Sequence, residues 1–444
     1  MADRRSWKPI TRLDVYYQDD GEAVKVGGLA SDRRGTVHFQ YDAGWIETGK
    51  ELSPIQLPIK IGSAVVPAPD RRRLHGLHGL FADSLPDRWG MRVLDIALRR
   101  HDIEAQRAGS LDRLAYLGSR TMGALTFRPA TEWPAEAARA ASLDSLAAQA
   151  ELVYEGKVDA DLRTDRTACD GVVPASAIDA LERAAGTAGG AQPKVLVATS
   201  PDGASLVSGG DAPPGYTAYL LKFTPRRDGL GLRTDCGQIE QAYARMAHDV
   251  GIDIPPTRLF PTADGRWHFA AERFDRTRAG GRRHVHTLGG LLGREAGDDG
   301  DYDELLRLTR ALTGDMRALE EVLRRLCFNL AVLNDDDHLK NVAFLLDPAE
   351  GWQLAPAYDL TFAPARHGER GMSVSGREGE TTWATVEALT ARHSVRGARV
   401  REIRSEVEAC VDRWPAHAKR AHVPEASIIE LTHAFKARRQ ALAQ

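Results

Sequence analysis

The sequence predicts an α+β protein, in which a β-rich N-terminal domain that also carries helices is followed by a region ending in a mostly α-helical part. Three observations predict this class: partly alternating apolar residues with Gly-containing turns over residues 12–62, apolar residues at helical spacing beyond about 285, and alternating strand-like and helical segments in between. With 444 residues, 43% of them hydrophobic, the chain is long enough for two or three domains with sizeable cores.

The first domain is predicted to span residues 1–130. Strands are expected at 13–17, 24–26, 37–41 and 124–127, and helices from about 75 and at 111–117. Pro86 suits the start of a helix, and Pro129 and Pro134 interrupt the chain where the domain is expected to end.

The remainder divides into an Ala-rich segment at 131–186, predicted to be a helical bridge, and a third region at 187–444. In the third region strands are expected at 195–197, 219–223 and 268–274, with a helix around 239–250. Beyond about 285 the pattern is helical, apart from a predicted hairpin at 342–354, and residues 385–440 are predicted to form helices of mixed charge.

The composition narrows the class of function. The 59 basic and 62 acidic residues nearly cancel, which excludes the global basicity of a protein that mainly coats nucleic acid. No Cys-x-x-Cys pair occurs, so free thiols are expected at Cys169, Cys236, Cys327 and Cys410. Without a signal-peptide core near Met1 or an apolar run of about 18 residues, we expect a cytoplasmic protein with no membrane partner.

The most informative stretch is the acidic run Asn334-Asp-Asp-Asp-His-Leu-Lys-Asn341, which lies between two apolar segments. Asp336 and Asn341 are five residues apart, the offset between the catalytic base and the metal-binding Asn of protein kinases. The hairpin that follows would bring Asp359 near Asn341. Asp336 is therefore a candidate base, with Asn341 and Asp359 as candidate Mg²⁺ ligands. A solvated acidic loop is the alternative.

A nucleotide site is expected upstream of the acidic run. Residues 188–194 combine small residues, whose backbone N–H groups can approach phosphate, with the cation of Lys194. An ordinary Gly-Gly turn with a surface lysine is the alternative. Lys222 lies in an apolar strand and needs an anionic partner, which Glu240 on the next helix could supply. A lysine at a strand edge is the simpler interpretation.

The chain resembles the HipA-like serine/threonine kinase toxins of bacterial type II toxin–antitoxin modules over nearly its whole length. In the first domain the matching motifs are Phe39-Gln-Tyr-Asp-Ala-Gly-Trp45, Leu52-Ser-Pro54, Leu80-Phe-Ala-Asp-Ser-Leu-Pro-Asp87 and Gly123-Ala-Leu125. Further on they are Gly189-Gly-Ala-Gln-Pro-Lys194, Leu221-Lys-Phe223, Glu272-Arg-Phe-Asp-Arg276, Asp336-Asp-His-Leu-Lys-Asn341 and Pro356-Ala-Tyr-Asp-Leu360. The resemblance implies that residues 187–444 form a bilobal protein-kinase-like catalytic region, with a small nucleotide lobe to about 276 and a helical lobe after it.

The resemblance also implies residue roles. ATP phosphates would be held by the loop at 189–194, with Gly189, Gly190, Ala191, Gln192 and Lys194, and by Lys222. Adenine would lie against the strand backbone at Glu272, Arg273 and Phe274, whose side chains could equally form ion pairs of their own. His338 and Lys340 would face the nucleotide, Asp336 would be the base, and Asn341 and Asp359 would bind Mg²⁺. Thr187 stands where family members carry an autophosphorylated hydroxyl residue, although it could simply be a threonine in a turn.

The resemblance further implies partners. A small helix-turn-helix antitoxin (HipB-like) would bind the chain and provide most of the DNA contact, and the protein substrate would be an aminoacyl-tRNA synthetase whose phosphorylation halts translation. The rivals are a small-molecule phosphotransferase and a non-catalytic scaffold that binds a repressor. His284-Val-His286 has metal-ligand spacing without a nearby third ligand, and Arg71-Arg-Arg73 and Arg282-Arg283 are expected to be solvated or to assist DNA binding.

Overall fold

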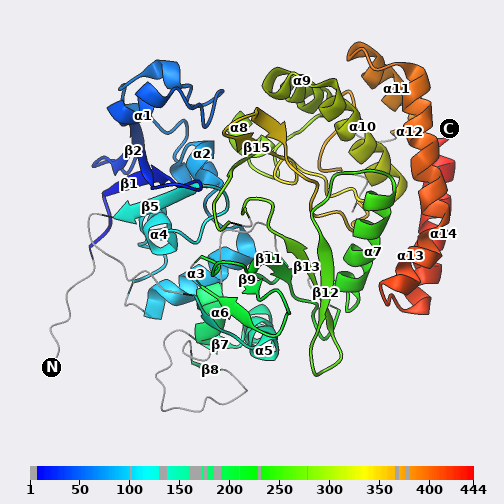
Figure 1. Cartoon of the computed structure of the whole chain (residues 1–444), viewed down its shortest axis with the longest axis horizontal. Helices are drawn as coiled ribbons and strands as arrows, with labels where there is room; N and C mark the ends of the chain where they lie inside the picture. The colour runs from blue at the N-terminus through cyan, green and yellow to red at the C-terminus, as the bar shows by residue number, and fades with distance from the viewer. Residues whose placement is uncertain are drawn as a thin grey trace.

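The computed structural model describes residues 8–100, 103–129, 138–159, 173–174, 178–184, 192–209, 211–228, 232–277, 279–365, 370–376 and 381–444. Within these ranges it confirms the predicted α+β class. A β-rich N-terminal part and a second sheet lie beside a helical C-terminal part, whose helices α12 (Gly397–Asp412) and α14 (Glu425–Leu442) run along one edge of the molecule (Figure 1).

The N-terminal part is built on an antiparallel sheet of five strands in the order β4-β3-β2-β1-β5. The strands are β1 (Arg12–Tyr17), β2 (Val24–Ser31), β3 (Val37–Tyr41), β4 (Val66–Pro67) and β5 (Leu125–Pro129). The α-helices of this part are α1 (Ala43–Thr48), α2 (Gly79–Ala82), α3 (Arg88–Arg100) and α4 (Ser110–Leu117), and its short 3-10 helices are η1 (Ile59–Ile61) and η2 (Leu74–Gly76). The alternation in β1 buries Leu13, Val15 and Tyr17 in one hydrophobic core.

A second antiparallel sheet has the order β12-β13-β11-β9-β10-β6. Its strands are β6 (Arg139–Ala140), β9 (Lys194–Thr199), β10 (Leu206–Ser208), β11 (Thr217–Lys222), β12 (Thr257–Pro261) and β13 (Trp267–Glu272). Helix α7 (Cys236–Asp249) contacts β12 and β13. Trp89 and Val93 of α3 share a core with this sheet, so the N-terminal domain packs directly against it.

The segment predicted as a helical bridge is more mixed than expected. It contains α5 (Leu143–Tyr154) and α6 (Asp179–Ala184), but also β7 (Val158–Asp159) and β8 (Val173–Pro174), which pair in parallel. In addition, β6 pairs with β10 at the edge of the second sheet before Ser142 caps α5. The pairing of β6 involves two residues and depends on β10, which is distant in sequence, so the Ala-rich composition of this segment could not predict it.

The helices of the C-terminal part pack around one large hydrophobic core. A small sheet of three strands, in the order β14-β15-β16, lies beside these helices. The strands are β14 (His284–Thr287), β15 (Ala343–Asp347) and β16 (Gly351–Leu354), so the predicted hairpin is confirmed. The remaining helices are α8 (Leu288–Leu292), α9 (Tyr302–Thr313), α10 (Met316–Ala331), α11 (Trp383–Arg392) and α13 (Trp414–Arg420). Of the helices within the described ranges, none combines the length and apolarity needed to cross a bilayer.

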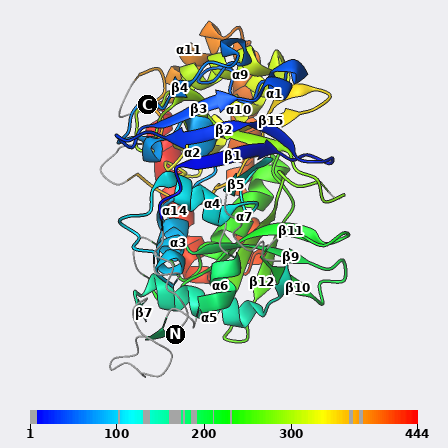
Figure 2. The same ribbon diagram turned by 90° about the vertical axis from the view of Figure 1, so that its left-hand side faces the viewer.

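The two sheets lie one above the other when the molecule is viewed from the side (Figure 2), and buried polar groups join the N-terminal domain to the rest of the chain. His284 contacts the carbonyl oxygen of Leu52 at 2.9 Å, and His286 lies between Asp83 at 2.7 Å and Ser53 at 3.1 Å. The histidine pair with metal-ligand spacing is thus engaged in contacts between the two parts of the chain.

Arginines at this boundary also depart from the expectation of solvated basic faces. Arg282 is only 2% exposed; it donates to the carbonyl oxygen of Ser119 and pairs with Asp211, so the expectation is wrong for this residue. Arg73 is more exposed and pairs with Asp298 of the C-terminal part. The motif spacing could not reveal these partners because they are distant in sequence.

Candidate functional site

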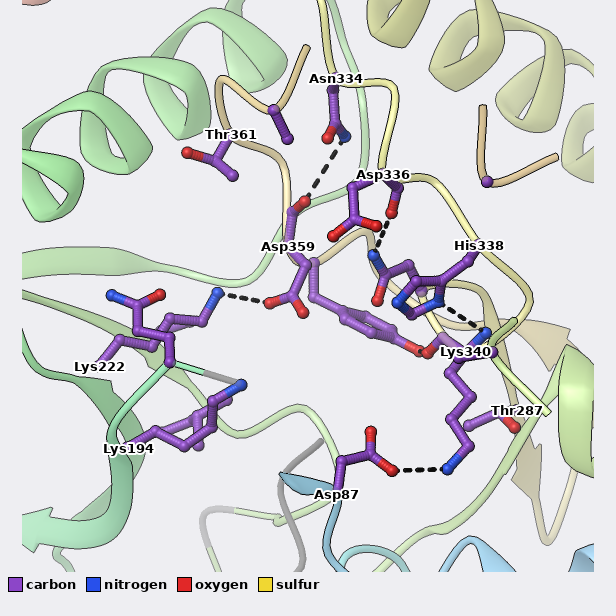
Figure 3. A pocket seen from close by; sticks show the side chains of 18 of the residues that line it. Asp87, Lys194, Lys222, Thr287, Asn334, Asp336, His338, Lys340, Asp359 and Thr361 are labelled. Carbon is purple, nitrogen blue, oxygen red and sulfur yellow. Dashed lines mark hydrogen bonds and ion pairs between the residues drawn. The ribbon is translucent and has the colours of Figure 1, made fainter. Parts of the chain in front are cut away.

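A cavity of about 1380 Å³ opens where the N-terminal domain, the second sheet and the helical part meet. Its lining includes residues from all three: Asp83 and Asp87, Lys194 and Lys222, and Asp336, His338, Lys340 and Asn341 with Asp359. Figure 3 shows the labelled side chains converging on this space. The cavity therefore gathers most of the described site residues that the sequence predicted.

Lys222 stands at the end of β11 and is held by two carboxylates. Its Nζ lies 2.5 Å from Oε1 of Glu240 on α7 and also pairs with Asp359, as the dashed line in Figure 3 marks. Burial alone would lower the pKa of Lys222, but Asp359 and Glu240 outweigh it and raise this pKa above its ordinary value. The predicted partner Glu240 is confirmed, and Lys222 is a buried, charged lysine.

Lys194 lies directly beside Lys222 because the two residues are partners in the register of β9 and β11. Burial lowers the pKa of Lys194, although the carboxylate of Asp359 opposes this. The backbone carbonyl of Lys194 accepts a hydrogen bond of 3.0 Å from the indole of Trp89 in the N-terminal domain. Two lysine side chains thus lie beside the half-buried carboxylate of Asp359, an arrangement suited to an anionic ligand such as a phosphate chain.

Asp359 has the backbone conformation φ 55°, which L residues rarely adopt. Its carbonyl oxygen accepts a hydrogen bond of 3.5 Å from Nδ2 of Asn334, whose backbone N–H in turn donates to Asn329. Burial raises the pKa of Asp359, but Lys222 and Lys194 together hold this pKa well below its usual range. The aspartate is therefore ionised and fixed in orientation.

The three consecutive aspartates have different surroundings. Asp335 is buried and pairs with Arg370 and with Arg438 of α14. Asp337 is also buried; it accepts from the hydroxyl of Tyr302 at 2.5 Å and from Arg370 at 2.9 Å. Asp336 alone is exposed, and it lines the cavity. The buried pair anchors the loop, so the acidic run is more than a solvated loop.

Asp336 carries its carboxylate into the cavity between Asp359 and His338 (Figure 3). The cavity walls remove part of its hydration and raise the pKa of Asp336; the imidazole of His338 opposes this rise and the carboxylate of Asp359 adds to it. Its backbone carbonyl accepts a hydrogen bond of 2.7 Å from Nδ2 of Asn341. That bond uses the amide nitrogen of Asn341, so the amide oxygen is the atom of this side chain that could bind a metal.

Lys340 reaches the N-terminal domain. Its Nζ lies 2.7 Å from Oδ1 of Asp87, just before α3. Burial alone would lower the pKa of Lys340, but Asp87 outweighs it and raises this pKa. The sequence placed Lys340 at the nucleotide, but gave no indication that a residue more than 250 positions upstream holds it.

The motif Glu272-Arg-Phe-Asp-Arg276 lines the cavity with its first three residues and also joins two parts of the chain through Asp275. The buried carboxylate of Asp275 pairs with Arg273 and Arg276 and accepts a hydrogen bond from the backbone N–H of Gly123. The backbone N–H groups of Glu272 and Arg273 donate to the carbonyls of Pro256 and Ala218, so neither N–H is available to adenine. Of these three residues, Phe274 is the one whose backbone N–H has no recorded acceptor within the described part of the chain.

The other predicted residues are less informative. The amide of Gln192 donates to the carbonyl of Phe223 at 3.2 Å, which ties the residue to the end of β11. Thr187, Gly189, Gly190 and Ala191 lie outside the described residues. Sequence reasoning missed Arg370, Arg438 and Tyr302, since each acts on the site from a distant segment and lies outside the matched motifs. Asp87 ends one of those motifs, but no role in the site was predicted for it.

Comparisons with known proteins agree with this architecture. Residues 13–128 match the HipA N-terminal domain family, and residues 186–414, more than half of the chain, match the HipA-like C-terminal domain family. The fold and the cavity thus define a two-part protein of HipA type. The chain belongs to the HipA-like family.

Individual relatives share limited identity with the chain. A Sinorhizobium fredii protein named "Putative kinase Y4mE" is 27% identical over 364 residues, covering 78% of this chain and 76% of the relative. A Haemophilus influenzae protein named "Putative kinase" is 25% identical over 156 residues, covering 32% of this chain and 44% of its own length. The chain of a Shewanella oneidensis HipA, HipB and operator DNA complex has the same fold, with a TM-score of 0.65, 17% identity and coverage of 96% of this chain and 95% of its own.

Proposed function

We propose that the chain is an ATP- and Mg²⁺-dependent serine/threonine protein kinase and the toxin of a type II toxin–antitoxin module. The observation that carries the proposal is the position of Asp336, a lone accessible carboxylate on an anchored loop, beside Lys222 and Asp359 in one cavity. The names of the relatives support a kinase, and membership of the HipA-like family supports the toxin role.

Phosphoryl transfer gives each residue a role. The carboxylate of Asp336 accepts the proton of the acceptor hydroxyl, whose oxygen attacks the γ-phosphorus while the bond to the β–γ bridging oxygen breaks and ADP leaves. Lys194 and Lys222 bind the phosphates as cations. Because Asp336 has a raised pKa, its ionised carboxylate is a better proton acceptor than that of an ordinary aspartate.

The residues at Asn341 and Asp359 fit Mg²⁺, which prefers oxygen ligands. Asn341 offers its amide oxygen, and Asp359 offers an ionised carboxylate that is shared with Lys222. Among the residues that the structure describes, no cluster of three His, Cys, Asp or Glu side chains could hold a metal on its own, so the ion would depend on nucleotide phosphates for further ligands. Mg²⁺ would neutralise charge on the phosphates.

The partners follow from the family. The Shewanella relative was solved with HipB and operator DNA, which supports a HipB-like helix-turn-helix antitoxin as the partner and DNA contact mainly through it. We further propose an aminoacyl-tRNA synthetase as the protein substrate, so that its phosphorylation stops translation and growth. We also propose that the chain phosphorylates itself at Thr187, as the resemblance to the family implies.

Transfer of label from γ-labelled ATP tests the proposal. The wild-type chain, incubated with a cell lysate, should label itself or another protein, and Asp336→Asn should label neither while still binding ADP. Asp202→Asn, which changes a carboxylate in an exposed turn, is the matched control and should behave like the wild type. Label found only in small molecules would favour the small-molecule phosphotransferase, and no transfer by the wild type would favour a non-catalytic scaffold.

A further inference from the structure

We propose that Asp87 of the N-terminal domain is a positioning residue of the phosphoryl-transfer site, which it serves by fixing the ammonium of Lys340 at the wall of the cavity. This inference rests on the proposed kinase function. It makes the N-terminal domain a part of the catalytic unit, where the motifs alone confine the site to the region from 187 onward.

The contact between the two residues is close and sheltered. Oδ1 of Asp87 lies 2.7 Å from Nζ of Lys340, and the two side chains are 23% and 17% exposed. Both residues line the cavity that Lys222 and Asp336 also line. Figure 3 shows the pair and Lys222 on opposite sides of Asp359. A ligand held by Lys222 would therefore also be within the space that the Asp87–Lys340 pair borders.

Lys340 is fixed by its backbone as well as by its side chain. Its N–H donates to Nδ1 of His338 at 3.2 Å, and its carbonyl oxygen accepts from the hydroxyl of Tyr358 at 2.7 Å. Tyr358 immediately precedes Asp359, and Asn341 immediately follows Lys340. Lys340 thus joins the loop of Asp336 to the segment of Asp359, and Asp87 fixes its one flexible part.

The chemistry explains why the side chain needs a fixed partner. A lysine stem has four rotatable bonds, and its ammonium carries three hydrogens. One hydrogen bond to Asp87 leaves two for phosphate oxygens. Asp83 and Glu295 also lie close enough to Lys340 to affect its pKa, so a lysine freed from Asp87 has other carboxylates to turn to.

The position of Asp87 is itself set by a rigid boundary. Four residues upstream, the carboxylate of Asp83 accepts hydrogen bonds of 2.8 Å from both the backbone N–H and the hydroxyl of Thr287. Two residues downstream, the indole of Trp89 donates to the carbonyl of Lys194. Asp87 lies between these two attachments, one to the helical part and one to the nucleotide-binding strand, so its carboxylate is placed with the precision that positioning requires.

A double-mutant cycle on the full chain tests the inference. Asp87→Asn, Lys340→Met and the double variant are compared with the wild type for transfer of label from γ-labelled ATP and for ADP affinity. Asp87→Asn should slow transfer by roughly 10- to 100-fold and change ADP affinity less than about twofold, since the misplaced group acts on the transferred phosphoryl. The double variant should be no slower than Lys340→Met, because the two residues act as one unit.

Controls separate positioning from a general loosening of the domain boundary. Arg73→Gln also removes an ion pair between the N-terminal domain and the C-terminal part, but Arg73 does not line the cavity, so transfer should stay near the wild-type rate. Asp87→Glu keeps the negative charge and should transfer label faster than Asp87→Asn but more slowly than the wild type. If Asp87→Asn folds poorly, Asp87→Glu replaces it in the comparison.

Three results would overturn the inference: a wild-type rate for Asp87→Asn, independent losses in the double variant, or an equal loss in Arg73→Gln. A wild-type chain that transfers no label overturns the kinase proposal and this inference together. If the wild-type chain transfers label and Asp87→Asn transfers it at the same rate, this inference alone is overturned.

Discussion

Gly79 of α2 lies against the backbone of Gly290 in α8: a Cβ built on Gly79 would come within 1.9 Å of the carbonyl oxygen of Gly290. Gly290 in turn leaves room for Asp83, whose Oδ2 would be 2.2 Å from a Cβ there. This close approach of two short helices lets Asp83 reach Thr287 and brings the following segment, with Asp87, to the cavity.

Gly79→Ala should therefore destabilise the protein by about 1–3 kcal/mol, because the new methyl group meets backbone atoms that cannot move aside alone. Urea unfolding monitored by circular dichroism measures the loss. Gly28→Ala in β2 is the matched control, since the nearest atom to its Cβ would be Oδ1 of Asp14 at 3.9 Å. Equal stability of the two variants would show that the α2–α8 contact adapts.

Arg370 bridges Asp335 and Asp337 and is mostly buried. Arg370→Met should lower the free energy of unfolding by about 3–5 kcal/mol, because it leaves buried carboxylates short of a counter-charge. The midpoint of urea unfolding provides the measurement. Arg317→Ala removes the exposed pair with Asp315 and should leave the midpoint unchanged. If both variants keep the wild-type midpoint, the loop does not need Arg370 as its anchor.

Three buried histidines should make stability depend on pH. Burial lowers the pKa of His78 and His268 to about 4 and that of His284 to about 3, against an ordinary value of 6.5. Between about pH 6.5 and 4 the unfolded chain therefore binds protons that the folded chain does not. The free energy of unfolding should fall as the pH drops, by up to about 1.4 kcal/mol per pH unit for each histidine.

Urea unfolding at pH 7, 6 and 5 measures this slope. His268→Asn removes one titrating group and offers an amide oxygen in place of Nδ1, which accepts from the backbone N–H of Thr224 at 3.0 Å. The variant should show a slope that is shallower by about one histidine's share. An unchanged slope would mean that folding does not lower the pKa of His268.

Glu240→Gln should lower the rate of label transfer by roughly 10²-fold, because Lys222 loses one of its two anionic partners and is drawn toward Asp359. Transfer from γ-labelled ATP at saturating nucleotide measures the effect. The matched control is Gln241→Glu, at the neighbouring residue. The amide of Gln241 donates to the hydroxyl of Thr257 on β12 and does not line the cavity, so this variant should keep more than half of the rate. Similar losses in both variants would indicate damage to α7 as a whole.

The sequence predicted most regular elements because their signals are local. The alternation of Leu13, Val15 and Tyr17 and the helical spacing of Ile239, Tyr243 and Met246 each mark a buried face. The pairing of Lys222 with Glu240 was also predictable, since a charge in an apolar strand needs a nearby partner. These inferences depend on residues within about twenty positions of one another.

The rest of the site depends on contacts that no local pattern encodes. The division of the acidic run into one accessible and two anchored aspartates comes from Arg370, Arg438 and Tyr302. The same holds for the pairing of Lys340 with Asp87 and for the use of the Glu272 and Arg273 N–H groups inside the protein. Tertiary structure alone decides which of several similar side chains faces the cavity.

The ion pair between Asp335 and Arg438 also has a consequence for the order of events during synthesis. The ribosome makes Asp335 about a hundred residues before Arg438, so the acidic loop leaves it before its last counter-charge exists. Domains fold as their segments emerge, and the N-terminal domain can form first. The loop that carries Asp336 therefore gains its last ion pair only after α14 has been made. A nascent chain that lacks α14 cannot yet hold this loop as the finished protein does.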